Sequence, residues 1–115
     1  MSDPAIDRKT FAELSETMGE DFMKELVAAY IEDTPQQFER LGEALTTGDA
    51  ETFRRAAHTI KSTSLNFGAS GLAGQARQLE ELGRAGLLDG AAPQIDTLKA
   101  AFTQVQKELQ ELGYA

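Results

Sequence analysis

Apolar residues recur every three or four positions along almost all of this 115-residue chain, and no stretch alternates apolar and polar residues as a strand would. The pattern is clearest near the C-terminus, in residues 95–112. Spacings of three and four are typical of a helix packed nearly antiparallel against its neighbours. The pattern therefore predicts an all-α fold. The C-terminal seam consists of Ile95, Leu98, Phe102, Val105, Leu109 and Leu112.

Glycines and small polar residues divide this pattern into five helical segments. We expect a short helix over residues 8–18, a long one over residues 20–46 and a third over about residues 50–67. A fourth ends near Gly86, and the last carries the C-terminal seam. The residues that we expect to cap these segments are of the usual types: Asp7, Gly19, Gly48, Asp49, Gly68 and Ser70.

The long second segment contains a proline, Pro35. Because proline lacks a backbone donor, we expect a kink or a brief interruption there, with Thr34 capping the second half anew. The broad apolar face of this segment is predicted to consist of Phe22, Leu26, Tyr30, Phe38, Leu41 and Leu45.

Short connections favour antiparallel packing of helices that follow one another. We therefore expect an up-down antiparallel four-helix bundle, with the short first helix capping one end. A chain of this length buries roughly 65% of its unfolded surface, which is enough for one core. No linker or repeat divides the sequence, so we expect a single domain over residues 1–115 and, since the apolar seams pack internally, a monomer.

Composition excludes several classes of function. The chain has no cysteine, which excludes disulfides and thiolate metal sites, and its net charge of -8 repels nucleic acids and anionic membranes. No apolar stretch approaches the ~18 residues needed to span a bilayer. Residues 1–4 lack the basic and apolar regions of a signal peptide. We expect a cytoplasmic protein that binds neither nucleic acid nor membrane.

The chain has one histidine, His58, and it falls outside the predicted core face of the third segment. At about 100° per residue, His58 lies roughly 140° from Phe53, which is in the middle of that face. The imidazole is therefore expected to point toward solvent. The core face is predicted to consist of Phe53, Ala56, Ala57, Ile60, Ser64 and Phe67.

Four residues accompany His58 on the exposed side of this helix: Arg55, Lys61, Ser62 and Leu65. A neutral imidazole nitrogen is a good nucleophile, and Lys61, three positions on, can reach a phosphoryl group placed on it. Arg55 is a second nearby cation. Phosphoryl transfer needs little beyond positioning and charge neutralisation, so these residues form half of a site and a partner supplies the rest. Ser62 leaves space for that partner and Leu65 offers it apolar surface.

The sequence from position 57 to 68, AHTIKSTSLNFG, resembles the signature of histidine-containing phosphotransfer (HPt) domains. That signature has a histidine, an apolar residue two positions on, a lysine three on, small residues after it, and a glycine ten on. The resemblance covers nearly the whole chain, including residues 32–35, the Gly48-Asp49 break and the region of Leu79 and Glu80.

The resemblance implies a four-helix bundle that carries phosphoryl groups between receiver-domain aspartates of a multistep phosphorelay. By this likeness, His58 accepts the group on its outer ring nitrogen, Lys61 steadies it, and Gly68 shapes the turn and the docking surface. Glu80, with Gln78 nearby, would hold the inner N–H of the ring. Such a carboxylate orients the ring and makes the outer nitrogen more electron-rich.

The partners implied are receiver domains of response regulators and of hybrid sensor kinases. The chain lacks the glycine-rich loop and acidic metal cluster that a kinase needs for ATP, so we expect no self-phosphorylation and no cofactor. Any Mg²⁺ is expected on the receiver. Many family members have glycine directly after the lysine, where this chain has Ser62. That difference bears on the range of partners rather than on the activity.

Other readings of the sequence remain open. A non-catalytic adaptor would bind receiver domains or other signalling proteins through His58 and Lys61 without taking phosphate. A metal-dependent enzyme in the bundle core is disfavoured, because such sites use Glu-x-x-His pairs and position 55 is an arginine. The domain could also be a module cut from a hybrid sensor kinase, although Met1 favours a free-standing protein.

Overall fold

The computed structural model describes residues 5–114. These residues form five helices and no strand, which confirms the all-α prediction. The helices are α1 (Arg8–Met18), α2 (Glu20–Thr47), α3 (Ala50–Asn66), α4 (Ser70–Ala85) and α5 (Ala92–Glu111).

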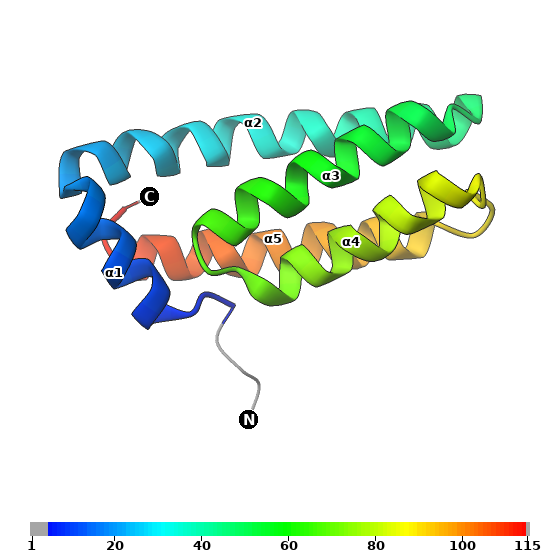
Figure 1. Ribbon diagram of the computed structural model, residues 1–115. Coiled ribbons are helices and arrows are strands. Elements are labelled where there is room, and N and C mark those ends of the chain that lie inside the picture. Colours follow the sequence, from blue (N-terminus) through cyan, green and yellow to red (C-terminus); the bar gives the residue numbers. More distant parts are fainter. Residues whose placement is uncertain (1–4, 115) are drawn as a thin grey trace.

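Helices α2 to α5 lie alongside one another, and α1 lies at one end of them (Figure 1). The most extensive packing joins α3 to α4, and α3 also packs against α2. Helix α5 lies against both α2 and α4, whereas α1 packs against α2. The molecule measures 42 × 31 × 18 Å, so its long axis follows these helices. Among residues 5–114, no helix has the length and apolar character needed to cross a membrane.

Aromatic rings link the helices through the core. The ring of Tyr30 on α2 lies 4.8 Å from that of Phe67, directly after α3, and 5.4 Å from that of Phe102 on α5. Phe102 also meets Phe38 edge-on at 5.5 Å. Such edge and tilted arrangements are the favourable ones for aromatic pairs. The predicted core face of α3 is confirmed, since all six of its members are buried: Phe53, Ala56, Ala57, Ile60, Ser64 and Phe67.

Helix α2 continues through Pro35 without a break. The expected interruption and the capping role of Thr34 are therefore wrong. Thr34 is buried, and its hydroxyl donates a 2.7 Å hydrogen bond to the carbonyl of Tyr30, four residues earlier in the same helix. A proline removes one backbone hydrogen bond, and the buried Tyr30 and Phe38 on either side of it hold this long helix against the core.

The first two turns of α2 bury a different stripe from the one predicted. Phe22 is 47% exposed, whereas Met23 and Val27 are fully buried. Met23 and Val27 keep to the three-and-four spacing that leads to Tyr30 and Phe38, and Phe22 lies one position off that stripe. The placement of Phe22 in the core was therefore wrong.

Most of the predicted helix caps are confirmed. The carboxylate of Asp7 accepts hydrogen bonds from the backbone N–H groups of Lys9 and Thr10, and that of Asp49 accepts one from the N–H of Thr52. Gly19, Gly48 and Gly86 lie at the C-terminal ends of their helices, all with positive φ.

Ser70, by contrast, is not a cap. Helix α4 already includes Ser70, and its N-cap residue is Ala69, which provides no side-chain hydrogen bond. The turn after Gly68 is tight enough that the carbonyl of Ala69 accepts a 3.0 Å hydrogen bond from the N–H of Ala73. The helix therefore starts one residue earlier than the serine suggested.

The segment before α1 is held between two distant parts of the chain. The carboxylate of Glu108 on α5 accepts hydrogen bonds from the backbone N–H groups of Ala5 and Ile6, at 2.5 and 3.1 Å. On the other side, the N–H of Asp7 donates a 2.9 Å hydrogen bond to the carbonyl of Gly68 in the α3–α4 turn. Gly68 has a φ of 74°. A Cβ there would lie 3.1 Å from the Asp7 carbonyl oxygen, so glycine suits both the turn and the close contact.

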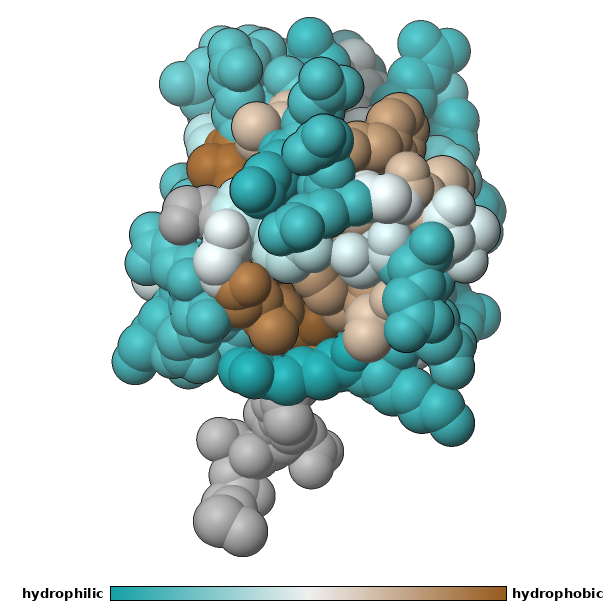
Figure 2. Space-filling model, turned by 90° about the vertical axis from the view of Figure 1, so that its left-hand side faces the viewer, coloured by the Kyte–Doolittle hydropathy of each residue, from teal (hydrophilic) through white to brown (hydrophobic). Residues whose placement is uncertain are grey.

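The end of the molecule at which α1 lies is mainly hydrophilic, with separate hydrophobic patches between polar side chains (Figure 2). Two large apolar residues next to the α1–α2 turn are about half exposed: Met18 and Phe22.

Candidate functional site

His58 lies on α3 with its side chain 53% exposed, as the helical periodicity predicts. Its Nδ1 atom is 2.6 Å from Oε2 of Glu80, a residue of the neighbouring helix α4. The other ring nitrogen, Nε2, lies 3.5 Å from Oγ of Ser62, one turn further along α3. The carboxylate therefore occupies one nitrogen of the ring and leaves the other accessible.

Glu80 is a buried carboxylate with more than one partner. Its side chain is 4% exposed, and its Oε1 lies 2.6 Å from Nζ of Lys61. Nη2 of Arg84, on the same helix, is 3.8 Å from Oε2. Burial alone would raise the pKa of Glu80, but the hydrogen bonds from Lys61 and His58 outweigh it and hold the pKa below its usual 4.5. Glu80 is thus an anion at neutral pH.

The ionised state of Glu80 decides which nitrogen of His58 carries the proton. A carboxylate can only accept hydrogen bonds, so Nδ1 must be the donor and holds the hydrogen. In the neutral ring, Nε2 then has the free lone pair. The geometry presents a nucleophilic nitrogen toward solvent at a fixed ring orientation.

Lys61 is directed toward Glu80 rather than into solvent, and its side chain is 25% exposed. Arg55 is more exposed, at 74%, and its Nε is 3.0 Å from a carboxylate oxygen of Glu51. The structure therefore brings Lys61 into the His58–Glu80 cluster and directs Arg55 toward its own helix.

The remaining predicted residues lie at different depths. Ser62 is exposed beside the imidazole, and Leu65 is 53% exposed. Gly68 is buried against Asp7 and Thr10 at the start of α1, where it belongs to the turn rather than to the surface around His58.

Sequence reasoning missed two arginines of α4 that lie next to this cluster. Arg77 and Arg84 line a groove of about 510 Å³ between α3 and α4, together with Lys61, Glu80 and Leu65. Spacings of three and four residues place Arg77 and Arg84 on the same face of α4 as Glu80. Once Glu80 had been singled out, this spacing could have identified both arginines from the sequence.

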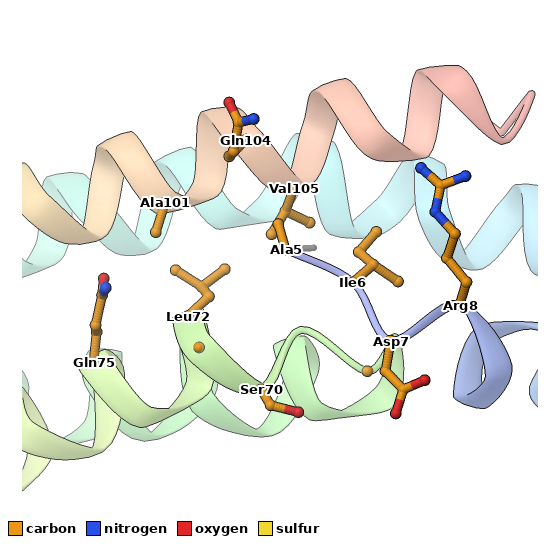
Figure 3. Close-up of a pocket in the computed structure, with 12 residues that line it drawn as sticks. Ala5, Ile6, Asp7, Arg8, Ser70, Leu72, Gln75, Ala101, Gln104 and Val105 are labelled. Atoms are coloured by element: carbon orange, nitrogen blue, oxygen red, sulfur yellow. The ribbon is translucent and has the colours of Figure 1, made fainter. Parts of the chain in front are cut away.

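A second hollow, of about 630 Å³, lies between α4, α5 and the segment before α1 (Figure 3). Leu72 and Val105 line it from the two helices, together with Gln75, whose Oε1 is buried without a hydrogen-bond partner. His58 and Lys61 are both bonded to Glu80, and none of these three residues lines this hollow. It is separate from the histidine cluster. Within residues 5–114, no three histidine, aspartate or glutamate side chains gather as metal ligands.

Comparisons with known proteins agree on the kind of domain. The sequence profile of the Hpt domain matches residues 25–112. The chain is similar in structure to histidine-containing phosphotransfer protein B (HptB) from Pseudomonas aeruginosa PAO1, with a TM-score of 0.86 and 31% sequence identity. That match covers 99% of this chain and 100% of the other. No curated protein matches the chain in sequence.

Proposed function

The chain belongs to the Hpt domain family, and on that premise we propose that His58 accepts a phosphoryl group from a receiver-domain aspartate and passes it to another. The observation that carries the proposal is the 2.6 Å contact between Nδ1 of His58 and the buried carboxylate of Glu80. This contact fixes the ring and its tautomer, and it leaves Nε2 as the reacting atom.

In the accepting step, the lone pair of Nε2 attacks the phosphorus of an aspartyl phosphate. The Nε2–P bond forms as the P–O bond to the aspartate breaks, and the electron pair of that bond stays on the released carboxylate. The imidazole of His58 becomes cationic, and its Nδ1–H remains hydrogen-bonded to Glu80, whose charge stabilises it. Passing the group on reverses these events: a second aspartate attacks phosphorus and the electron pair returns to Nε2.

Lys61 neutralises the transferred group. In the resting protein its Nζ is bonded to Glu80, on the carboxylate oxygen next to the one that holds His58. A phosphoryl group on Nε2 adds negative charge one helical turn away, within reach of the flexible lysine side chain. Lys61 then divides its hydrogen bonds between Glu80 and the phosphoryl oxygens. Ser62 donates to the same oxygens from the outer side of the ring.

The rest of the reaction site belongs to the partner. We propose receiver domains of response regulators and hybrid sensor kinases as partners, with Mg²⁺ bound by the receiver. The protein acts as a carrier and does not phosphorylate itself with ATP. In this proposal it is a monomeric single domain over residues 1–115. Its helices α2 to α5 form an up-down antiparallel bundle that α1 caps, an arrangement that the packing of sequential helices supports.

A transfer assay tests the assignment. The protein is incubated with a receiver domain that carries radioactive phosphate on its aspartate, and label that is stable to base and labile to acid is followed on the protein. We expect wild-type protein to acquire such label and His58→Gln to acquire none, since glutamine has no nucleophilic ring nitrogen.

Two results would contradict the assignment. Label that persists on His58→Gln would place the accepting atom elsewhere. Receiver binding by wild-type protein without labelling from any donor would favour the non-catalytic adaptor. Circular dichroism of His58→Gln serves as the folding control, and the exposure of this side chain leads us to expect an unchanged spectrum.

A further inference from the structure

The two helices that hold His58 and Glu80 differ in charge from the rest of the protein. Residues 50–85 contain five basic and three acidic side chains, whereas the other residues contain six basic and sixteen acidic ones. This segment therefore has a net charge of +2 in a protein whose net charge is -8. An acidic partner is therefore repelled by most of the molecule and attracted to helices α3 and α4.

All three acidic side chains in this segment are paired with basic ones, but to different degrees. Glu80 is buried and bonded to Lys61. Glu51 is 2.7 Å from Arg54 and 3.0 Å from Arg55. The third, Glu81, lies 3.4 Å from Arg77 in an ion pair whose members are both more than half exposed. Exposed pairs of this kind contribute little, so Arg77 can exchange Glu81 for a partner carboxylate at small cost.

The groove between α3 and α4 concentrates these positive charges beside the reacting histidine. Arg77 and Arg84 are 70% and 64% exposed along it. Lys61 and Glu80, which form the inner side of the histidine cluster, also line the groove, and Leu65 adds an exposed apolar side chain. The groove is therefore continuous with the site at which a phosphoryl donor must dock.

We propose that this groove receives an acidic edge of the receiver domain, and that Arg77 discriminates between receivers by the charge of that edge. The proposal rests on the function proposed above and names the surface on which the partner docks. A guanidinium binds a carboxylate through two parallel hydrogen bonds, which gives both attraction and a preferred orientation. The side chain of Arg77 is paired with Glu81 and not with His58 or Glu80, so it acts on docking rather than on the transfer step.

The test compares two charge reversals of equal size, Arg77→Glu in the groove and Arg40→Glu on α2. Arg40 is exposed and does not line the groove. Two receiver domains serve as donors, one with acidic and one with basic residues around its aspartate, each phosphorylated with acetyl phosphate and then separated from it. The initial rate of transfer is measured against donor concentration at low salt and at about 0.5 M salt.

We expect Arg77→Glu to lower kcat/KM for the acidic receiver by about 10-fold at low salt, mainly through a higher KM. High salt should reduce this difference, because it screens exposed charges. Arg40→Glu should change the value less than 2-fold. For the basic receiver Arg77→Glu should raise kcat/KM, because the new carboxylate attracts the basic residues that Arg77 repels. Arg77→Gln provides a milder variant with the charge removed, and thermal unfolding checks that all variants fold.

Equal effects of Arg77→Glu and Arg40→Glu would show that net charge alone matters and would overturn the docking site. So would an unchanged kcat/KM for Arg77→Glu. In both cases wild-type protein is still labelled, and the proposed function stands. If no receiver labels wild-type protein, the proposed function fails and the docking site fails with it.

Discussion

Glu80 determines most of the chemistry around His58, although it lies on the neighbouring helix. One carboxylate oxygen holds Nδ1 of His58 and the other holds Nζ of Lys61, each at 2.6 Å. These two bonds offset the cost of burying the charge, and they keep the pKa of Glu80 below 4.5. In the mechanism that we propose, the same carboxylate therefore orients the nucleophile, His58, and restrains Lys61, the cation that steadies the phosphoryl group.

The lowered pKa of Glu80 makes part of the stability depend on pH. A carboxyl group whose pKa is lower in the folded state stabilises the protein above its unfolded pKa, and this contribution is lost as pH falls through the folded value. We expect wild-type protein to be more stable than Glu80→Gln at pH 7, with a difference that shrinks below about pH 4.5. Urea unfolding at a series of pH values measures the free energy of unfolding of both proteins.

The neighbouring Glu81 is the matched control for this prediction, because it is exposed and has one weak ion pair. Glu81→Gln should differ little from wild type at any pH. A gap between wild type and Glu80→Gln that stays constant from pH 7 to pH 3 would contradict the role given to the charge of Glu80.

Helical periodicity alone predicted from the sequence that His58 faces outward. Glu80 was predicted by resemblance, and its role stays a prediction. The bond between Lys61 and Glu80 was not foreseen, because it depends on how α3 and α4 are placed against each other. Periodicity gives the face of a helix on which a residue lies, but not the residue that a neighbouring helix sets opposite it.

Helices α3 and α4 approach each other so closely that a glycine, Gly83, occupies one of their contacts. A Cβ on Gly83 would lie 2.9 Å from backbone atoms of Arg54. Backbone cannot move aside as the end of a side chain can. Gly83 therefore sets the separation of the two helices whose side chains form the histidine cluster.

Gly83→Ala should consequently destabilise the protein by roughly 1–3 kcal/mol, because the added methyl group forces the helices apart. Gly74 is the matched control: it lies in the same helix, and a Cβ there would meet nothing within 4 Å. Gly74→Ala should stabilise by up to about 1 kcal/mol through helix propensity. Thermal or urea unfolding measures the stability of the two variants. A Gly83→Ala protein more stable than wild type would refute the close contact.

The prediction of the elements succeeded where one residue determines the structure. Asp7, Asp49 and Gly48 mark helix ends through their own side chains or backbone conformation. It failed for the interruption at Pro35 and for the burial of Phe22, where packing decides the outcome. A proline predicts a broken helix only if the core does not hold both halves, and that information lies in other helices.

For the whole molecule, the apolar seams of the helices pack against one another, and the larger part of the surface is acidic. We therefore expect a monomer at micromolar concentration, because like charges oppose self-association and the exposed Met18 and Phe22 form only a small apolar area. Light scattering coupled to size exclusion should give the mass of one chain at low and at moderate salt. A mass of two chains would contradict this expectation.

The bonds from Ala5 and Ile6 to Glu108 also impose an order on folding during synthesis. Ala5 lies 103 positions before Glu108 in the sequence, and Ile6 lies 102 positions before it. A ribosome adds about 5–20 residues per second, so the start of the chain waits on the order of 5–20 s for its partner carboxylate. Helices α2 to α4 can associate in that interval. The segment before α1 can attain its native position only after α5 has been made.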